Sequence, residues 1–405
     1  MNLLSQGLDY FKNKNVLLLQ GPVGSFFYRL SKDLKRHGAI VHKINFNLGD
    51  FIYYPSNAHF YRGDMDSWSQ YFEKFIHNEK ISHVILFGDC RFIHKSIHSI
   101  ARSNNIEIFA FEEGYLRPNH ITFEKYGVNN NSLLPREAGF YKRCSLTHLT
   151  TRNIPNTYWP MIWSGFIYHL FLWLGQFVFT KYQHHKKITF SSAFPWLVSV
   201  YRKIYFSFKE RDIQRLLTSK FSKKFFLAPL QISSDFQIQE HSDIDSMYTF
   251  IETLIKSFAK NSKQGDILVI KHHSMDRGHV DYSSFIDYLT TRFFLKDRIY
   301  YIHDQHLPTL LNHAKGVVVV NSTVGLSAIH HLVPTKVLGK ALYDMDGLTY
   351  QGELDHFWEV ANQSKPDTKL VEKFITYLIT KTQINGSFYR PKRDSGFKSG
   401  VFWAP

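Results

Sequence analysis

Short apolar runs alternate with helical patterns in the first third of the chain. Asn15–Gln20 is an apolar run of strand length, and a Gly-Pro-Val-Gly turn separates it from a helical pattern over Ser25–His37. Further runs of strand length follow at Ile40–Ile44, His83–Phe87 and Ile106–Phe111, with a second helical pattern between the last two. Strands that alternate with helices in this way build parallel sheets. The first third therefore predicts an α/β domain.

The alternation stops over residues 151–201 and then resumes. The strands expected in this second region are Phe225–Leu230, Asp266–Ile270, Ile299–Ile302, Gly316–Val320 and Thr335–Gly339. Helical patterns separate them. The sequence thus predicts an α/β fold with two Rossmann-like parallel-sheet domains, and a cleft between the two domains makes the expected architecture GT-B-like.

The pattern also sets the expected domain boundaries. We expect the first domain over residues 1–150, a helical connector rich in aromatic residues over 151–220, and the second domain over 221–360. Residues 361–405 are expected to form a helix and a tail that pack back on the first domain. The chain has 405 residues, which is more than one core usually serves, so two domains fit its length.

The connector contains one nearly continuous apolar segment, Trp159–Thr180. A transmembrane helix needs about 20 apolar residues, so length alone permits a span. However, His169 and Gln176 interrupt the segment, its aromatic residues suit the headgroup interface, and the basic flank Lys181–Lys187 suits anionic lipid. Three interpretations stay open: a helix at the membrane interface or lining a groove, an ordinary core helix, and a true span.

Charge and cysteine content narrow the classes of partner. The formal net charge is +15 and the pI is near 9.5. The basic clusters are short, and the zinc-spaced Cys/His sets of common DNA-binding proteins are missing, so we expect anionic lipid and phosphorylated ligands as partners and no nucleic acid. Cys90 and Cys144 alone cannot form a disulfide framework, and Met1–Lys14 lacks the apolar core of a signal peptide. We therefore expect a cytoplasmic chain.

Acidic residues follow two of the expected strands in the first domain. Asp89 comes just after His83–Phe87, and Glu112 and Glu113 end the next strand. The carboxyl ends of parallel strands are where doubly wound sheets bind ligands. A carboxylate facing a cleft there is a candidate general base or nucleophile, whereas the simpler interpretation is a surface turn with a salt bridge. Arg117, shortly after them, is a candidate partner for the second carboxylate or for an acidic sugar.

Two turns lead into helices and are candidate anion sites. The first contains Gly21 and Gly24 but lacks the full dinucleotide fingerprint, and a tight turn without a ligand explains it equally well. The second is Asn321-Ser322-Thr323, which offers hydroxyls and backbone N–H groups at a helix N-terminus. Plain N-capping by Ser322 or Thr323 needs no ligand, and both functions are compatible.

Basic residues end the strand Asp266–Ile270 of the second domain. Lys271, His272 and His273 follow it directly, and such groups neutralise a phosphate leaving group. Side chains of adjacent histidines diverge, so the spacing argues against zinc, and we expect no metal site.

Several long motifs carry a resemblance to a known family. They include LLLQGPVGSFFYRLSKDL, LFGDCRFIH, FEEGYLRPNHITFEKYGVN, KHHSMDRG and NSTVGLSAIHH. From Leu17 to about Trp358 the chain resembles the KpsS/LipB family of capsule polysaccharide proteins. The resemblance implies a retaining β-Kdo transferase, where Kdo is 3-deoxy-D-manno-oct-2-ulosonic acid. Such an enzyme moves Kdo from CMP-Kdo to a phosphatidylglycerol-type lipid and starts a poly-Kdo linker. CMP-Kdo is a substrate, so the resemblance implies no cofactor.

The resemblance also assigns roles to residues. Glu113 takes the place of the catalytic carboxylate, but this chain has Glu where related KpsC proteins have Asp, which leaves the choice between Glu113 and Glu112 open. It also has His-Ser where the pattern has His-Pro. The catalytic candidates are Glu113, Glu112 and Asp89; the donor-binding candidates are Lys271, His272, His273, Arg277, Asn321, Ser322 and Thr323; the candidates for the acceptor side and the rest of the cleft are Gly21, Gly24, Arg91 and Arg117.

The implied partners are CMP-Kdo, a phosphatidylglycerol-type lipid, the membrane surface and other capsule assembly proteins. The implied location is the cytoplasm, peripheral at the inner face of the cytoplasmic membrane. Two alternatives remain: a capsule export or assembly factor without catalysis, and another GT-B enzyme such as a nucleotide-sugar epimerase.

Overall fold

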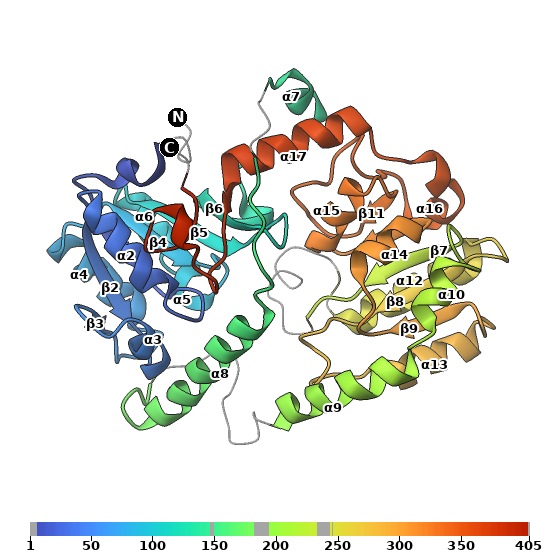
Figure 1. Ribbon diagram of the computed structural model, residues 1–405, viewed down its shortest axis with the longest axis horizontal. Coiled ribbons are helices and arrows are strands. Elements are labelled where there is room, and N and C mark those ends of the chain that lie inside the picture. Colours follow the sequence, from blue (N-terminus) through green and yellow to red (C-terminus); the bar gives the residue numbers. More distant parts are fainter. Residues whose placement is uncertain (1–5, 146–149, 182–193, 233–243, 245, 404–405) are drawn as a thin grey trace. The chain divides into compact units, whose positions relative to one another are not determined.

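The computed structural model describes residues 6–145, 150–181, 194–232, 244 and 246–403. The chain divides into two compact units (Figure 1). Unit 1 comprises residues 1–133, 146–189 and 376–405, and unit 2 comprises residues 134–145 and 190–375. The α/β class with two Rossmann-like domains is therefore confirmed, while the cleft between them stays a prediction.

Unit 1 contains a seven-stranded sheet with the order β12-β6-β5-β4-β1-β2-β3. Its strands are β1 (Asn15–Leu18), β2 (Ile40–Asn45), β3 (His59–Phe60), β4 (His83–Phe87), β5 (Glu107–Glu113), β6 (His120–Lys125) and β12 (Gln383–Asn385). The five strands β1 to β5 run parallel, and β6 and β12 add an antiparallel edge. The helices of this unit are α2 (Phe26–Arg36), α3 (Leu48–Tyr53), α4 (Trp68–Asn78), α5 (Phe92–Lys95), α6 (His98–Ser103) and α8 (Tyr158–Leu174).

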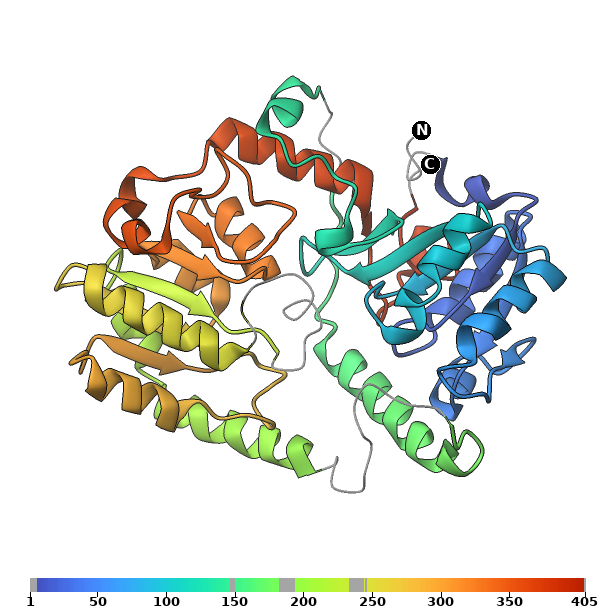
Figure 2. The same cartoon turned by 180° about the vertical axis from the view of Figure 1, so that it is seen from behind.

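Burial on both faces of the sheet explains the continuous apolar run at β1. Val16 and Leu18 belong to one buried cluster, and Leu17 and Leu19 belong to another. Successive side chains of a strand point to opposite faces, so a strand covered on both faces must be apolar throughout. Helices cover both faces of this sheet, as Figure 1 and the rear view in Figure 2 show.

Unit 2 contains a five-stranded parallel sheet with the order β11-β10-β7-β8-β9. Its strands are β7 (Phe225–Pro229), β8 (Ile267–Lys271), β9 (Ile299–Ile302), β10 (Gly316–Val319) and β11 (Thr335–Val337). Its helices are α7 (Ala138–Arg143), α9 (Phe194–Lys209), α10 (Ile213–Thr218), α12 (Met247–Asn261), α13 (Ser283–Arg292), α14 (Leu307–His313), α15 (Thr323–His330) and α16 (Leu354–Val360). Phe226, Phe258 and Trp358 lie in the main apolar cluster, where the Trp358 indole N–H donates to Ser257 Oγ at 2.7 Å.

The residues expected as a connector, 151–220, are divided between the two units. α8 belongs to unit 1, whereas α9 and α10 belong to unit 2. Residues 134–145 belong to unit 2 although they precede α8 in the sequence. The chain re-enters unit 1 within α17 (Thr368–Thr382), and β12 then pairs with β6.

The aromatic segment folds as α8, which packs closely on α3. A Cβ added to Gly49 would lie 2.8 Å from the Tyr168 ring, and one added to Gly175 would lie 2.4 Å from Leu48 Cβ. Both glycines therefore permit a close approach of the two segments. Within the described part of the chain, no helix is long and apolar enough to cross a membrane.

Candidate functional site

The predicted carboxylate pair lies at the end of β5, against the antiparallel strand β6. Glu112 is opposite Thr122 and Glu113 is opposite Ile121. A Cβ on Gly114 would lie only 2.0 Å from the His120 carbonyl oxygen, so the bend directly after the pair requires glycine. The Glu-Glu-Gly sequence is thus matched to this tight turn.

The two carboxylates have different partners. Glu112 Oε1 accepts a hydrogen bond from the backbone N–H of Glu113 at 2.9 Å. Glu113 Oε1 accepts one from the Tyr389 hydroxyl at 3.2 Å. The negative charge of Glu113, after burial, helps to raise the pKa of the Tyr389 hydroxyl well above its ordinary range, so Tyr389 stays a donor. Glu113 is therefore positioned by a residue from the far end of the chain.

Burial raises the pKa of Glu112 to about 7. The charges of Glu113 and Asp89 raise it further, whereas the Glu113 N–H and Arg91 act in the opposite direction. A carboxyl group with a pKa near neutrality can both release and accept a proton under physiological conditions. Glu112 thus has the acidity of a general acid or base.

Arg91 connects the carboxylates to the point where the strand order of unit 1 reverses. The chain places β2 and β3 on one side of β1 and β4 on the other, so the switch point lies between β1 and β4. Arg91 Nη1 donates to Gln20 Oε1 at 3.1 Å and to the Gly21 carbonyl at 3.4 Å, just past β1. A Cβ on Gly88 would lie 3.3 Å from Arg91 Nε and 3.6 Å from Glu112 Oε2. Gln20, Arg91 and Glu112 therefore gather where ligands bind in doubly wound sheets.

Asp89 is buried beside this cluster and holds a loop. Its Oδ2 accepts from the Val128 N–H at 3.2 Å and from Asn131 Nδ2 at 2.9 Å. Its Oδ1 is buried and has no hydrogen-bond partner among the described residues. The geometry gives Asp89 a structural role and a charge near Glu112, while its catalytic role stays a prediction. Arg117 is exposed, and its Nε donates to the Gly114 carbonyl at 3.2 Å, which braces the turn after the carboxylates.

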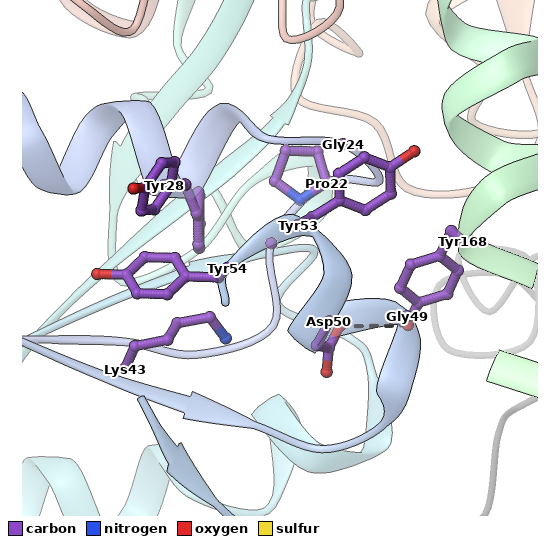
Figure 3. A pocket seen from close by; sticks show the side chains of 11 residues that line it. Pro22, Gly24, Tyr28, Lys43, Gly49, Asp50, Tyr53, Tyr54 and Tyr168 are labelled. Carbon is purple, nitrogen blue, oxygen red and sulfur yellow. Dashed lines mark hydrogen bonds between the residues drawn. The ribbon is translucent and has the colours of Figure 1, made fainter. Parts of the chain in front are cut away.

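Gly21 and Gly24 line a pocket that opens to solvent (Figure 3). The empty space between its walls, open solvent included, is about 280 Å³. Aromatic rings surround two buried polar groups, Lys43 and Asp50. Burial lowers the pKa of Lys43 to about 8 despite the favourable charge of Asp50. The complete lining is Gly21, Pro22, Gly24, Phe27, Tyr28, Lys43, Gly49, Asp50, Tyr53, Tyr54 and Tyr168.

A buried polar network joins this pocket to Arg91. Tyr168 on α8 donates to Asp50 Oδ1 at 3.3 Å and accepts from Gln20 Nε2 at 3.1 Å. Gln20 in turn accepts from Arg91. The pocket, α8 and the carboxylate cluster are therefore parts of one connected region of unit 1.

In unit 2, polar residues follow four neighbouring parallel strands. The strand order reverses between β7 and β10, where Gln231 Nε2 donates to Asn321 Oδ1 at 2.8 Å. Asn321 N–H donates back to Gln231 Oε1 at 3.3 Å. Ser322 caps α15 by accepting from the Val324 N–H at 3.2 Å, so the N-capping interpretation is correct. A phosphate-binding role for Asn321, Ser322 and Thr323 stays a prediction.

His272 is a neutral hydrogen-bonding group. Burial, followed by the charge of His303, lowers its pKa to about 3. Its Nδ1 lies 2.6 Å from the Tyr301 hydroxyl, and its Nε2 is buried without a hydrogen-bond partner in the described structure. Of the two roles expected at this strand end, cationic or hydrogen-bonding, the lowered pKa of His272 favours the second. The positive charge there comes from Lys271, whose Nζ donates to the His303 carbonyl at 2.9 Å, and from Arg277, which pairs with Asp304.

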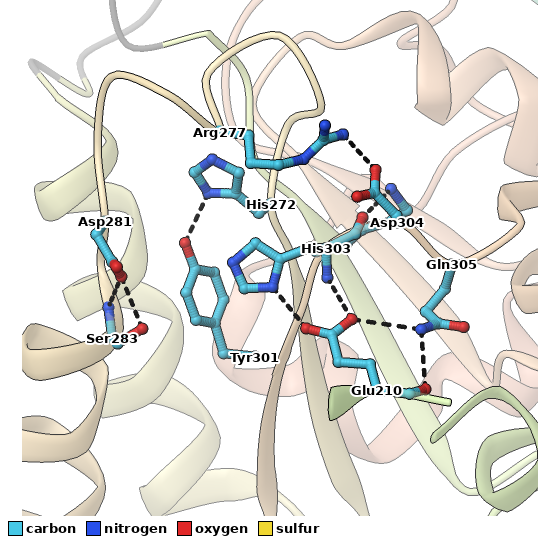
Figure 4. A network of polar contacts seen from close by, with 10 residues as sticks. Glu210, His272, Arg277, Asp281, Ser283, Tyr301, His303, Asp304 and Gln305 are labelled. Carbon is cyan, nitrogen blue, oxygen red and sulfur yellow. Dashed lines mark hydrogen bonds and ion pairs between the residues drawn. The ribbon is translucent and has the colours of Figure 1, made fainter. Parts of the chain in front are cut away.

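A buried polar network beside these residues is centred on Glu210 and His303, neither of which is among the predicted site residues (Figure 4). Glu210 Oε1 lies 2.6 Å from His303 Nδ1, and Glu210 Oε2 accepts from the His303 backbone N–H at 2.9 Å. The ring of Phe206 stacks on His303 with centroids 3.4 Å apart. Because His303 and Asp304 directly follow β9, the strand-end rule that found Lys271 would have found them too. No local signal identifies Glu210.

The family profile described as "Capsule polysaccharide biosynthesis protein" matches residues 82–389, which include the carboxylates of unit 1 and the polar strand ends of unit 2. The chain belongs to this capsule biosynthesis family. It is 38% identical to the capsule polysaccharide export protein KpsS of Escherichia coli, over 93% of this chain and 97% of that one. It is 37% identical to the capsule polysaccharide modification protein LipB of Neisseria meningitidis serogroup B, over 93% of this chain and 92% of that one.

Among solved structures, the β-Kdo 2,7 transferase KpsC of Thermosulfurimonas dismutans matches with 13% identity and a TM-score of 0.42. The match covers 85% of this chain and 91% of that one. A similarity at this level is too low to support a functional argument.

Replacement of Glu112 by glutamine in this capsule protein should change how stability depends on pH. The raised pKa means that the folded state holds a proton more tightly than the unfolded state, whose ordinary value is 4.5. The stabilisation is complete below that value and is lost as the pH rises through about 7. Glutamine mimics the protonated form at every pH, so Glu112→Gln should gain up to about 3 kcal/mol relative to wild type between about pH 5 and pH 8.

Urea unfolding of both proteins at several pH values measures this difference. Glu124→Gln is a second test of the same kind and should show a similar dependence on pH, because burial also raises the pKa of Glu124 to about 7 while its carboxylate bonds Tyr115 and Ser132. A difference between Glu112→Gln and wild type that stays constant with pH would contradict the raised pKa.

Proposed function

We propose that the protein is a retaining glycosyltransferase that moves β-Kdo from CMP-Kdo to a phosphatidylglycerol-type lipid and starts the poly-Kdo linker of a capsule polysaccharide. The observation that carries the proposal is the Glu112–Glu113 pair at the end of β5, with one carboxyl group near neutral pKa and the other hydrogen-bonded to Tyr389. Family membership supports a role in capsule synthesis.

The charge distribution supports an anionic donor. Kdo and the cytidine monophosphate that leaves it are both acidic. Transfer therefore needs hydrogen-bond donors and positively charged side chains around the leaving group. In unit 2, Lys271 and Arg277 supply charge, and Ser322 begins α15, whose N-terminal N–H groups suit phosphate. Neutral His272 suits the role of a hydrogen-bond donor to the phosphate, and it does not add charge.

The direct test is incubation of the purified full chain with CMP-Kdo and a phosphatidylglycerol analogue. A Kdo-bearing lipid and released CMP are the expected products. The name of the Escherichia coli relative, an export protein, favours a second candidate, which is an assembly factor without catalysis. Absence of any glycolipid product, together with retained binding to capsule assembly proteins, would favour that candidate and reject the transferase.

The acceptor part of the proposal rests on the outer face of α8. While Gly165, Tyr168 and Leu172 are buried, the opposite face leaves large apolar side chains exposed at helical spacing. Trp163 is 61% exposed and Phe177, just past the helix, is 91% exposed. This stripe consists of Trp159, Trp163, Phe166, Leu170, Trp173 and Phe177. Aromatic stripes of this kind suit the headgroup region of a membrane.

We predict that the protein binds anionic vesicles peripherally and in a salt-sensitive manner. Trp163→Gln should weaken partitioning by about thirtyfold, because a buried aromatic side chain contributes about 2 kcal/mol. Tyr288→Gln is the control, since Tyr288 is 56% exposed on α13 of unit 2, outside the stripe. Sedimentation with phosphatidylglycerol vesicles at low and high salt measures both effects. Equal binding by the two variants would exclude the stripe as the surface that contacts the membrane. Binding that does not change with salt would exclude an electrostatic contribution to membrane binding. The basic flank 182–187 lies outside the described residues.

A further inference from the structure

Two histidines and one glutamate converge at the β3 edge of the unit 1 sheet, away from the residues assigned above. His42 lies on β2, His59 begins β3, and Glu79 directly follows α4. Each offers one ligand atom, and these three atoms all lie within 4.8 Å of one another. In the parallel pairing, His59 is opposite Ile44, which lies on the same face of β2 as His42. The fold therefore gathers residues from three separate elements.

The spacing of His42 and Glu79 fits a shared ion better than a hydrogen bond. His42 Nδ1 lies 3.5 Å from Glu79 Oε2. Good N–H···O bonds measure about 2.7–3.2 Å, so this pair is too far apart for a strong one. Two ligands bound at about 2.0–2.2 Å to a tetrahedral zinc ion lie roughly 3.5 Å apart. The ligand atom of His59 must move about an ångström closer to the other two for tetrahedral coordination. Because His59 is exposed, rotation of its side chain permits this movement.

The surroundings of the three ligand atoms favour a bound cation. His42 Nε2 is buried and has no hydrogen-bond partner within the described residues. Glu79 caps the C-terminus of α4, where the helix dipole favours positive charge. Phe75 packs edge-on against both imidazoles and gives the site an apolar wall.

We propose that His42, His59 and Glu79 bind a divalent transition-metal ion of the zinc type, with water as the fourth ligand. Two imidazoles and one carboxylate suit zinc, cobalt or nickel, whereas magnesium and calcium prefer oxygen ligands alone. The ion links β2 and the two-residue edge strand β3 to the end of α4. Because the ion binds the folded arrangement, it stabilises unit 1, and this role is independent of sugar transfer.

The experiment titrates the full chain, prepared without a histidine tag, with zinc and separately with cobalt. The wild type should bind one equivalent by calorimetry, show the visible absorption of tetrahedral cobalt, and melt at a higher temperature with zinc. His59→Ala should weaken binding at least tenfold and abolish the zinc-dependent rise in melting temperature. His59 is the preferred site of change because it is exposed, and Glu79→Gln provides a second variant that keeps the side-chain shape.

His77→Ala is the matched control, because His77 is exposed in the last turn of α4 and outside the cluster. It should bind zinc as the wild type does. Absence of saturable binding to the wild type, or equal binding by His59→Ala and His77→Ala, would overturn the proposal. Neither outcome depends on the transferase assay, so a failure here is distinct from a failure of the proposed function.

Discussion

Glu113→Gln should reduce transfer of Kdo to the lipid acceptor by more than about a thousandfold while the protein keeps its fold. Glutamine has the same shape but is neither a nucleophile nor a base, and loss of such a group costs several powers of ten in rate. Glu113 Oε1 accepts a hydrogen bond from Tyr389, and an amide oxygen can still accept it, so the melting temperature should change little. Single-turnover assays with CMP-Kdo and thermal unfolding measure the two quantities.

Two further variants separate the roles of the adjacent carboxylates. Glu112→Gln should retain some transfer but lose the inflection near pH 7 that a group of this pKa imposes on the rate. Tyr389→Phe should lower transfer by less than about tenfold, because it removes one hydrogen bond that positions Glu113. Full activity of Glu113→Gln, with loss of activity in Glu112→Gln, would assign the catalytic role to Glu112 instead.

The strand ends were predictable because they depend on local pattern. A run such as Val84–Phe87 is apolar throughout, since both faces of the sheet are covered, and Gly88 and Asp89 after it mark where the strand stops. This reasoning placed Glu112 and Glu113 at the end of β5 and Lys271 at the end of β8. The local pattern offered Ser322 or Thr323 as an N-cap, and the structure has Ser322 at the N-cap of α15.

Protonation states and distant partners were not predictable from local pattern. The local pattern left His272 as either a cationic or a hydrogen-bonding group, and only its burial beside Tyr301 and His303 lowers its pKa and favours the neutral form. Tyr389 lies 276 residues from Glu113 in the sequence and reaches it only because β12 pairs with β6. These properties depend on which elements pack together, and the sequence specifies that only through the complete fold.

Glu210→Ala should lower the free energy of unfolding of unit 2 by about 3–5 kcal/mol, since removal of one partner of a buried pair leaves the other unpaired. The side chains of Glu210 and His303 are 9% and 5% exposed, and one carboxylate serves both the ring and the backbone N–H of His303. Glu210→Gln keeps an acceptor but loses the charge, so its effect should be intermediate. Urea unfolding followed by circular dichroism measures the change.

The matched control is Glu252→Ala, which removes a carboxylate from an exposed ion pair with Lys256 on α12 of the same unit. Exposed pairs of this spacing contribute about 0.3–0.5 kcal/mol, so this variant should unfold almost as the wild type does. Glu210→Ala should also weaken binding of CMP, because the His303 carbonyl holds Lys271 Nζ and the loss of Glu210 releases His303. Equal stability of the two variants would show that the network of Glu210 and His303 does not hold the end of β9, and unchanged CMP binding would separate that network from the donor side of the proposed reaction.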